Sequence, residues 1–230
     1  MTGAVALSLS LDKGKTVTSI LKSIGRKYPL AGYGGMFYHW LFGNEQRPYY
    51  SCGNGAAMRV SAVGWVAKSE KEVKELSKRV TEVTHNHPEG LKGAEVTAMC
   101  VFKALHGASK EELRNYIVSQ YPEVSVLNYE LLRATFKHEE ETCQKTVPQA
   151  LYCFLISNSF EDCLRTTISI GGDCDTTSAI SCAIAEAFYG IPEDFKREIL
   201  RYFTPRDRKV LLRGINEIYK SCGLENYLPL

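Results

Sequence analysis

Two aspartates two residues apart, with glycines before them and a threonine hydroxyl after them, are the side chains whose type and spacing best suit a chemical role. The segment that holds them reads Gly171-Gly172-Asp173-Cys174-Asp175-Thr176. If the chain is extended up to Asp175, the two carboxylates point to the same side. Together with the Thr176 hydroxyl they form a cluster of hard oxygen donors, which suits Mg²⁺, Mn²⁺ or Ca²⁺ rather than zinc.

The helix that must position these residues follows at once. Residues 176–189 are small and apolar, and Gly190 and Pro192 end the run, so we predict a helix buried nearly all round. A plainer interpretation makes Asp173 an ordinary N-cap at an ordinary turn. Two charged groups beside a buried helix need partners, however, and a cation is the simplest one. On these residues alone, the two interpretations have equal weight.

A second glycine-rich segment is Ser51-Cys52-Gly53-Asn54-Gly55, followed by a run of small residues. This pattern predicts a loop that feeds a helix N-terminus, where backbone N–H groups can receive a phosphate or a carboxylate. Asn-Gly is also a common hairpin turn, so the motif alone is a weak signal.

Two histidines, His85 and His87, stand two residues apart after a predicted helix. A helix does not place such a pair on one face, so we expect one of them to line a pocket through hydrogen bonds rather than bind a metal. Upstream, residues 29–40 combine glycines with several aromatic residues. We expect an irregular segment packed into the core, with a pocket lining as the alternative.

Composition excludes several classes of protein. The 230 residues carry a formal net charge of +2, which is too small to indicate the basic surface typical of direct nucleic-acid binding. No run is long enough to span a bilayer, and no basic leader precedes the first apolar residues. The eight cysteines form no Cys-x-x-Cys pair, as expected for reduced thiols in a cytoplasmic protein without membrane contact. Cys174 is a poor nucleophile candidate, because two neighbouring carboxylates would raise its pKa.

The periodicity predicts helices almost throughout. Capping-box patterns at Ser69 and Ser109 each open a helix, and Pro88 with Gly90 is expected to end the first. Pro148 is expected to start a helix that runs to Leu155. Further helices are predicted over 4–11, 16–27, 93–105, 193–203 and 206–221 and after Ser159, whereas 120–147 stay unassigned.

No long Val/Ile/Thr alternation suggests a sheet. The fold class is therefore all-α: a compact multihelical domain over residues 1–230, with about nine or ten helices of ordinary length.

Three segments together resemble the ADP-ribosylglycohydrolase family, the group that includes the dinitrogenase-reductase activating glycohydrolase. They are 51–60, Thr84-His85 with the following Gly93-Ala94, and 171–176. The acidic segment with its helix is the most specific, and Gly-Asn-Gly-x-x-Met-Arg is nearly as specific. The order and spacing match the family from residue 1 to about residue 190.

The resemblance implies an all-α fold with two divalent cations, usually Mg²⁺ and alternatively Mn²⁺, in a central cleft. It implies metal-assisted hydrolysis of the bond between ADP-ribose and a modified protein side chain or a related conjugate. By motif, Asp173, Asp175 and Thr176 would be metal ligands, and the two aspartates would act in catalysis through the metal. The residues that would contact ADP-ribose or an ADP-ribosylated protein are Ser51, Gly53, Asn54, Gly55, His85, Gly171 and Gly172.

One departure from the family pattern bears on activity. The family's N-terminal segment holds a catalytic glutamate and a Thr-Asp-Asp run, and Met1 to Leu7 resemble the helix that directly follows that run. We therefore expect a chain that is N-terminally shortened relative to the family, with weak metal binding. The enzyme interpretation leads, and the alternative is a non-catalytic relative that binds ADP-ribose or a nucleotide, or a purely structural protein.

Overall fold

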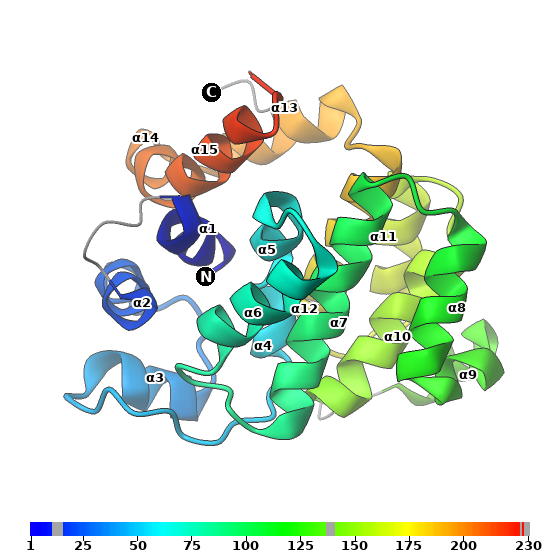
Figure 1. The fold of residues 1–230 in the computed structure, drawn as a ribbon, viewed down its shortest axis with the longest axis horizontal. Coiled ribbons are helices and arrows are strands. Elements are labelled where there is room, and N and C mark those ends of the chain that lie inside the picture. The colour runs from blue at the N-terminus through cyan, green and yellow to red at the C-terminus, as the bar shows by residue number, and fades with distance from the viewer. Residues whose placement is uncertain (11–15, 137–140, 226, 228–230) are drawn as a thin grey trace.

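The computed structural model describes residues 1–10, 16–136, 141–225 and 227, and all named elements within these ranges are helices (Figure 1). Gly53 and Thr142 form an isolated antiparallel bridge, and no strand is found in the described ranges. The elements are α1 Thr2–Ser10, α2 Val17–Gly25, α3 Gly35–Phe42, α4 Gly55–Met58, α5 Ser61–Val66, α6 Glu70–Thr81, α7 Pro88–Leu105, α8 Lys110–Gln120, η1 Pro122–Val126, α9 Tyr129–Thr135, α10 Cys143–Ile156, α11 Phe160–Ser169, α12 Cys174–Tyr189, α13 Glu193–Arg201, α14 Pro205–Asp207, η2 Arg208–Leu212 and α15 Arg213–Ser221.

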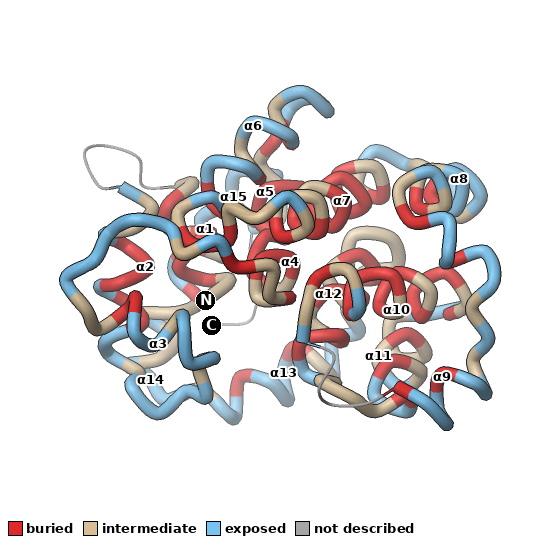
Figure 2. The backbone as a smooth tube through the Cα atoms, turned by 90° about the horizontal axis from the view of Figure 1, so that it is seen from below, coloured by how far each residue is buried: buried red, intermediate tan, exposed pale blue. Residues whose placement is uncertain are grey.

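Helix α7 is the centre of the arrangement. It packs against α4, α5, α6, α8, α10 and α12. A methyl group added at Gly64 of α5 would come to 2.6 Å from the Val101 Cβ of α7, so glycine allows these two helices to approach closely. Figure 2 shows the buried backbone concentrated where α4, α7, α10 and α12 meet.

Helix α12 is enclosed as predicted. No residue from Thr176 to Tyr189 is exposed, and the helix ends at Gly190, whose φ is +77°. It packs on α4, α7, α10 and α11. At its far end, the Tyr219 hydroxyl of α15 donates to the Glu186 carboxylate. The acid-bearing end of α12 therefore begins at the surface while the rest lies inside the bundle.

The two ends of the described chain lie side by side. Helix α1 packs against α15 as well as α2 and α5, and Figure 1 shows the blue and red helices adjacent. Within the described part, no helix is both long and apolar enough to cross a membrane. All eight cysteines fall in the described ranges, and all are free thiols.

The two predicted capping boxes differ in outcome. At Ser109 both reciprocal bonds with Glu112 are present. At Ser69 the hydroxyl accepts from the Glu72 N–H at 3.2 Å, but the Glu72 carboxylate accepts from the Lys68 N–H instead. Both serines still start the helices that the sequence predicted.

Two proline predictions were wrong. Pro88 does not end a helix; it is the first residue of α7, which therefore begins five residues before the expected start at Gly93. The preceding helix, α6, already ends at Thr81. Pro148 does not start a helix either, since it lies inside α10, which begins at Cys143.

The segment expected to be irregular contains a helix, because residues 35–42 form α3. The expected packing into the core was also largely wrong, because Trp40 is the only buried residue of the segment 29–40, whereas Met36 and Tyr38 are exposed. The expected number of helices was too low as well, because short helices such as α4 and α14 divide stretches that look continuous in the sequence.

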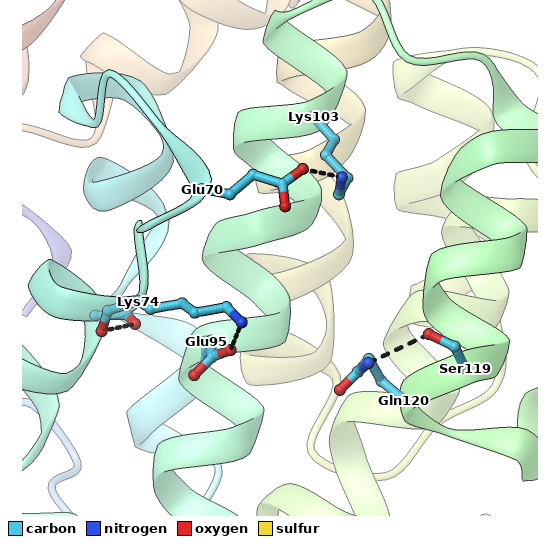
Figure 3. Close-up of polar contacts among 7 residues, drawn as sticks. Glu70, Lys74, Glu95, Lys103, Ser119 and Gln120 are labelled. Carbon is cyan, nitrogen blue, oxygen red and sulfur yellow. Dashed lines mark hydrogen bonds and ion pairs between the residues drawn. The ribbon is translucent and has the colours of Figure 1, made fainter. Parts of the chain in front are cut away.

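Ion pairs join α6 to α7 on the surface (Figure 3). Lys103 of α7 pairs with Glu70 of α6, and Lys74 of α6 pairs with Glu95 of α7 at 3.9 Å. Exposed pairs of this kind contribute little to stability, so the apolar contacts beneath them hold the two helices together.

Candidate functional site

The Gly53-Asn54-Gly55 turn is held mainly by backbone hydrogen bonds. The Asn54 N–H donates to the Glu141 carbonyl at 2.9 Å, and the Cys143 N–H donates to the Cys52 carbonyl at 2.8 Å. The turn then enters α4 at Gly55, as the sequence predicted. The segment that precedes α10 therefore fixes the position of the turn.

Asn54 joins the glycine turn to the acidic segment. Its amide nitrogen donates to an Asp173 carboxylate oxygen at 2.7 Å and to the Thr146 hydroxyl at 3.1 Å. Asn54 and Asp173 are 119 residues apart in the chain. The structure thus brings together two motifs that the sequence could only place in order.

The acidic segment turns on two glycines in the left-handed region. Gly171 has a φ of +79° and Gly172 a φ of +67°, which glycine adopts without the cost that a Cβ would bring. Asp173 follows at the N-cap position of α12, yet its carboxylate makes no capping hydrogen bond. The plainer interpretation is therefore right about the N-cap position of Asp173 but wrong about its side chain, which caps no N–H group of α12.

The two carboxylates influence each other. Burial raises the pKa of Asp173, and the neighbouring Asp175 raises it further, whereas the Asn54 amide acts in the opposite direction. Asp175 is exposed and accepts from the Thr176 N–H at 2.9 Å. A pair of acids in which one resists ionisation is an arrangement that a nearby positive charge would stabilise.

Thr176 lies where three helices meet. Its hydroxyl donates to the Met58 sulfur of α4 at 3.4 Å. The Thr2 hydroxyl of α1 donates to the Met58 carbonyl at 3.3 Å. Because the Thr176 oxygen donates in this bond, it keeps its lone pairs as acceptors.

His85 lies against the glycine turn. A Cβ built at either Gly53 or Gly55 would lie 3.6 Å from His85 Nε2. The ring is buried, and its Nδ1 is 2.8 Å from the Thr84 hydroxyl. Burial, helped by the charge of Arg59, lowers the pKa of His85 to about 2. The imidazole is therefore neutral, while His87 serves as the N-cap of α7.

Ser51 supports the turn from within. Its hydroxyl accepts from the Gly53 N–H at 3.1 Å, which leaves the hydroxyl proton for another partner. The carbonyl of Ser51 is approached by α7, because a Cβ at Gly90 would lie only 2.8 Å from it.

The structure adds residues that the sequence did not single out. Thr146 shares the amide of Asn54, but it falls in the stretch that stayed unassigned. Arg59 is 2 % exposed and donates to the Thr84 hydroxyl at 2.6 Å. Its place in the Gly-Asn-Gly-x-x-Met-Arg motif is the signal that could have found it.

The donors suit a hard cation only in part. Asp173, Asp175 and Thr176 supply two carboxylates and a hydroxyl in one place. Within the described ranges, no three or more His, Cys, Asp or Glu side chains gather to hold a metal ion. Oxygen donors of this type fit Mg²⁺ or Mn²⁺, but Mg²⁺ usually keeps several waters when so few side chains bind it.

Comparison with known proteins shows a family match and a shared fold. A family profile described as ADP-ribosylglycohydrolase matches residues 3–226. The ADP-ribosylhydrolase ARH3 of Homo sapiens is 28% identical in an alignment 218 residues long, and the match covers 74% of this chain and 59% of that protein. The ADP-ribosyl-(dinitrogen reductase) glycohydrolase of Rhodospirillum rubrum is 25% identical in an alignment 193 residues long, and the match covers 80% of this chain and 62% of that protein.

The chain thus spans about three fifths of the length of these curated relatives. A solved structure titled "ADP-ribosylglycohydrolase-related protein complex" superposes with a TM-score of 0.67 at 22% identity, covering 96% of this chain and 80% of that one. This likeness shows a shared all-α fold.

Proposed function

Because the chain belongs to the ADP-ribosylglycohydrolase family, we propose that it is a hydrolase of ADP-ribose conjugates. The bond cleaved is the glycosidic bond between ADP-ribose and a modified protein side chain or a related group. The observation that carries this proposal is the hydrogen bond from Asn54 to Asp173, because it joins the expected ligand-binding turn to the expected acidic centre.

The relatives support this substrate class by their names. One is an ADP-ribosylhydrolase and the other an ADP-ribosyl glycohydrolase. Identity of 28% or less over part of their length supports a class of substrate, not a particular linkage.

In the proposed complex, the glycine turn receives the diphosphate and the adjoining ribose. The turn leads directly into the N-terminus of α4, and a helix N-terminus favours an anion. The Gly53 and Asn54 N–H groups already donate to the Ser51 hydroxyl and the Glu141 carbonyl. Ser51 and His85 supply side-chain hydrogen bonds, and Gly53 and Gly55 leave room for the ligand to approach the backbone. Gly171 and Gly172 shape the other edge of the site.

We further propose that Asp173, Asp175 and Thr176 hold a divalent cation, Mg²⁺ or Mn²⁺. When bound, such a cation supplies Lewis acidity beside the ribose and offsets the charge of the two carboxylates. The chain's own part is positional: Asn54 orients Asp173, and Thr146 orients Asn54.

A second candidate is a protein that binds ADP-ribose or a nucleotide without hydrolysing it. The observation that favours it is the small donor set, since only two carboxylates meet at this point in the described ranges. A two-acid site would hold a cation weakly, and slow or absent turnover would follow.

The test compares hydrolysis with binding. Purified protein is incubated with ADP-ribosyl-arginine and with an ADP-ribosyl-serine peptide, with and without Mg²⁺, and released ADP-ribose is quantified. Calorimetric titration with ADP-ribose is run in parallel. The hydrolase proposal expects Mg²⁺-dependent release that Asp173→Asn abolishes and that Asp194→Asn, at an exposed position on α13, leaves intact.

Three outcomes separate the candidates. Release in the wild type supports the hydrolase. Binding of ADP-ribose without release supports the non-catalytic relative. Absence of both contradicts the two proposals together.

A further inference from the structure

Three buried side chains, those of Arg59, Thr84 and His85, are linked in a row, and we call them the relay. The relay ends at the His85 ring, which lies against the glycine turn. Arg59 Nη2 donates to the Thr84 hydroxyl oxygen at 2.6 Å, and that oxygen lies 2.8 Å from His85 Nδ1. Arg59 is 2 % exposed, Thr84 0 % and His85 6 %. The relay is therefore shielded from solvent along its length.

The relay contains a buried guanidinium that makes few hydrogen bonds, although its Cζ lies 5.8 Å from the centre of the Phe37 ring. Besides Thr84, Arg59 donates only weakly to the Val80 carbonyl at 3.5 Å, and its Nε has no partner within the described ranges. A neutral ring beside this charge prefers to present a lone pair toward it rather than an N–H. His85 Nδ1 is the ring nitrogen on that side.

The Thr84 hydroxyl has one proton to give, and Nδ1 is its best acceptor. The Thr81 carbonyl is 3.5 Å away, compared with 2.8 Å for Nδ1. The Tyr49 hydroxyl also lies near Thr84, which acts to lower the pKa of Tyr49, but the Tyr49 hydroxyl makes no hydrogen bond of normal geometry within the described ranges. Accepting a bond from a cation also makes a hydroxyl a stronger donor to the next group.

We propose that Arg59 and Thr84 are positioning residues that fix His85 as the tautomer with its proton on Nε2. The hydrogen bond made by one ring nitrogen decides which nitrogen carries the proton. The Nε2–H then points at Gly53 and Gly55, where it serves as a donor. This inference rests on the proposed function only for the identity of the acceptor, which would be an oxygen of ADP-ribose.

The relay explains why a histidine suits this place. A buried cation in contact with the ligand would bind any anion, and a hydroxyl could turn to donate or accept. A neutral ring locked with Nε2–H outward is a donor only, so it favours an oxygen acceptor at one location. Arg59 thus acts on the site without touching the ligand.

The direct test is nitrogen NMR on protein labelled with ¹⁵N-histidine. The two ring nitrogens have distinct shifts according to which one carries the proton, and loss of one set of signals in His85→Asn assigns the ring. We expect wild-type His85 to be protonated on Nε2 alone. Protonation on Nδ1 in the wild type would overturn the proposal without any variant of the relay.

Three threonine variants extend the test. Thr84→Ser keeps the hydroxyl and is expected to keep both the tautomer and the affinity for ADP-ribose. Thr84→Val removes it, so we expect Nδ1–H to appear and affinity to fall about tenfold. Thr81→Val is the matched control, because the Thr81 hydroxyl is buried without a partner in the described ranges.

The outcomes distinguish this proposal from the proposed function. Unchanged tautomer and affinity in Thr84→Val would overturn the relay, whatever the protein binds. An Nε2–H ring in the wild type that changes in Thr84→Val, in a protein that does not bind ADP-ribose, would support the relay and contradict the proposed function.

Discussion

Asn54 does more than form a turn, because one amide nitrogen serves both sides of the site. It donates to Asp173 and to Thr146, which come from the start of α12 and the first turn of α10. A carboxylate or a hydroxyl at position 54 could not donate twice from one atom in this way. The side chain is therefore suited to setting the distance between the turn and the acidic segment.

A single methyl group tests the role of the glycine turn. In Gly55→Ala the new Cβ would lie 3.6 Å from His85 Nε2, an ordinary contact, and alanine is the better residue at a helix start. We expect unchanged or slightly higher stability, and affinity for ADP-ribose reduced by about tenfold or more, equivalent to ~1.4 kcal/mol. Urea denaturation and calorimetric titration measure the two effects.

Gly35→Ala is the matched control, because Gly35 also opens a helix and no atom lies within 4 Å of the added Cβ. If Gly55→Ala bound ADP-ribose as tightly as Gly35→Ala, the turn would not be the ligand contact.

At the scale of single residues, the sequence indicated the polar groups that share a motif but not the ones that support them. Asn54, His85 and Asp173 could be chosen by type and spacing. Thr84 and Thr146 could not, because a buried threonine that holds another side chain looks like any other threonine in the sequence. Only the contacts in space separate them.

At the scale of elements, α12 carries the acidic pair at one end and a buried acid at the other. Glu186 accepts from the Tyr219 hydroxyl of α15, and Lys196 of α13 lies 3.7 Å from the centre of the Tyr227 ring nearby. Burial raises the pKa of Glu186 from 4.5 to about 7, against the lowering effects of the two tyrosine hydroxyls and Lys196. The packing of α12 on the C-terminal helices therefore depends on the protonation of this acid.

The sign of the pH effect follows from the raised pKa. The folded state holds the Glu186 proton more tightly than the unfolded state does, so this stability is fully present below the unfolded value. It is lost as pH rises through about 7, and the total amounts to about 3 kcal/mol.

We expect urea unfolding of the wild type to show this loss between about pH 5 and pH 8, and Glu186→Gln to remove most of it. Glu198→Gln on the exposed face of α13 should leave the pH dependence unchanged. Equal slopes of stability against pH in the wild type and Glu186→Gln would contradict the assignment.

Helix boundaries were predictable where a serine capped them and failed where another residue did. Ser109 opens α8 with both capping bonds. At α7 the cap is His87, whose Nδ1 accepts from the Glu89 N–H at 3.1 Å, and histidine is not a residue that signals a helix start. Pro88 then looked like a stop rather than the first helical residue.

Helix α3 was missed for a related reason. Its N-cap is Gly34, which makes no side-chain bond, and aromatic residues lie on several sides of it without a polar stripe. Burial and tertiary contact, not local pattern, decide such a helix.

At the scale of the whole molecule, ligand binding should raise the thermal stability of the protein. A ligand that binds only the folded state adds about 2.7 kcal/mol at a hundred times its Kd. For a chain of this size that corresponds to a rise in Tm of roughly 5–10 °C. We expect ADP-ribose to produce it in thermal denaturation and Gly55→Ala to reduce it. An unchanged Tm at millimolar ADP-ribose would contradict the proposed ligand.

The all-α class was accessible from the sequence because helical periodicity runs through it without a long Val/Ile/Thr alternation, and the family was accessible because three motifs occur in one order. The number and ends of the helices were less accessible, since α4, α5 and α6 follow one another with only short breaks. The packing of α12 was foreseen because small apolar residues on every side leave such a helix no stable place except the interior.

The backbone hydrogen bonds that hold the glycine turn have a practical consequence. Two main-chain bonds, from Asn54 to Glu141 and from Cys143 to Cys52, hold it in place. The side chains of Cys52 and Thr142 contribute nothing to these two bonds, since peptide groups make them. Substitutions at those two positions therefore change side chains next to the turn without removing either of these backbone bonds, which offers a route to engineered ligand selectivity.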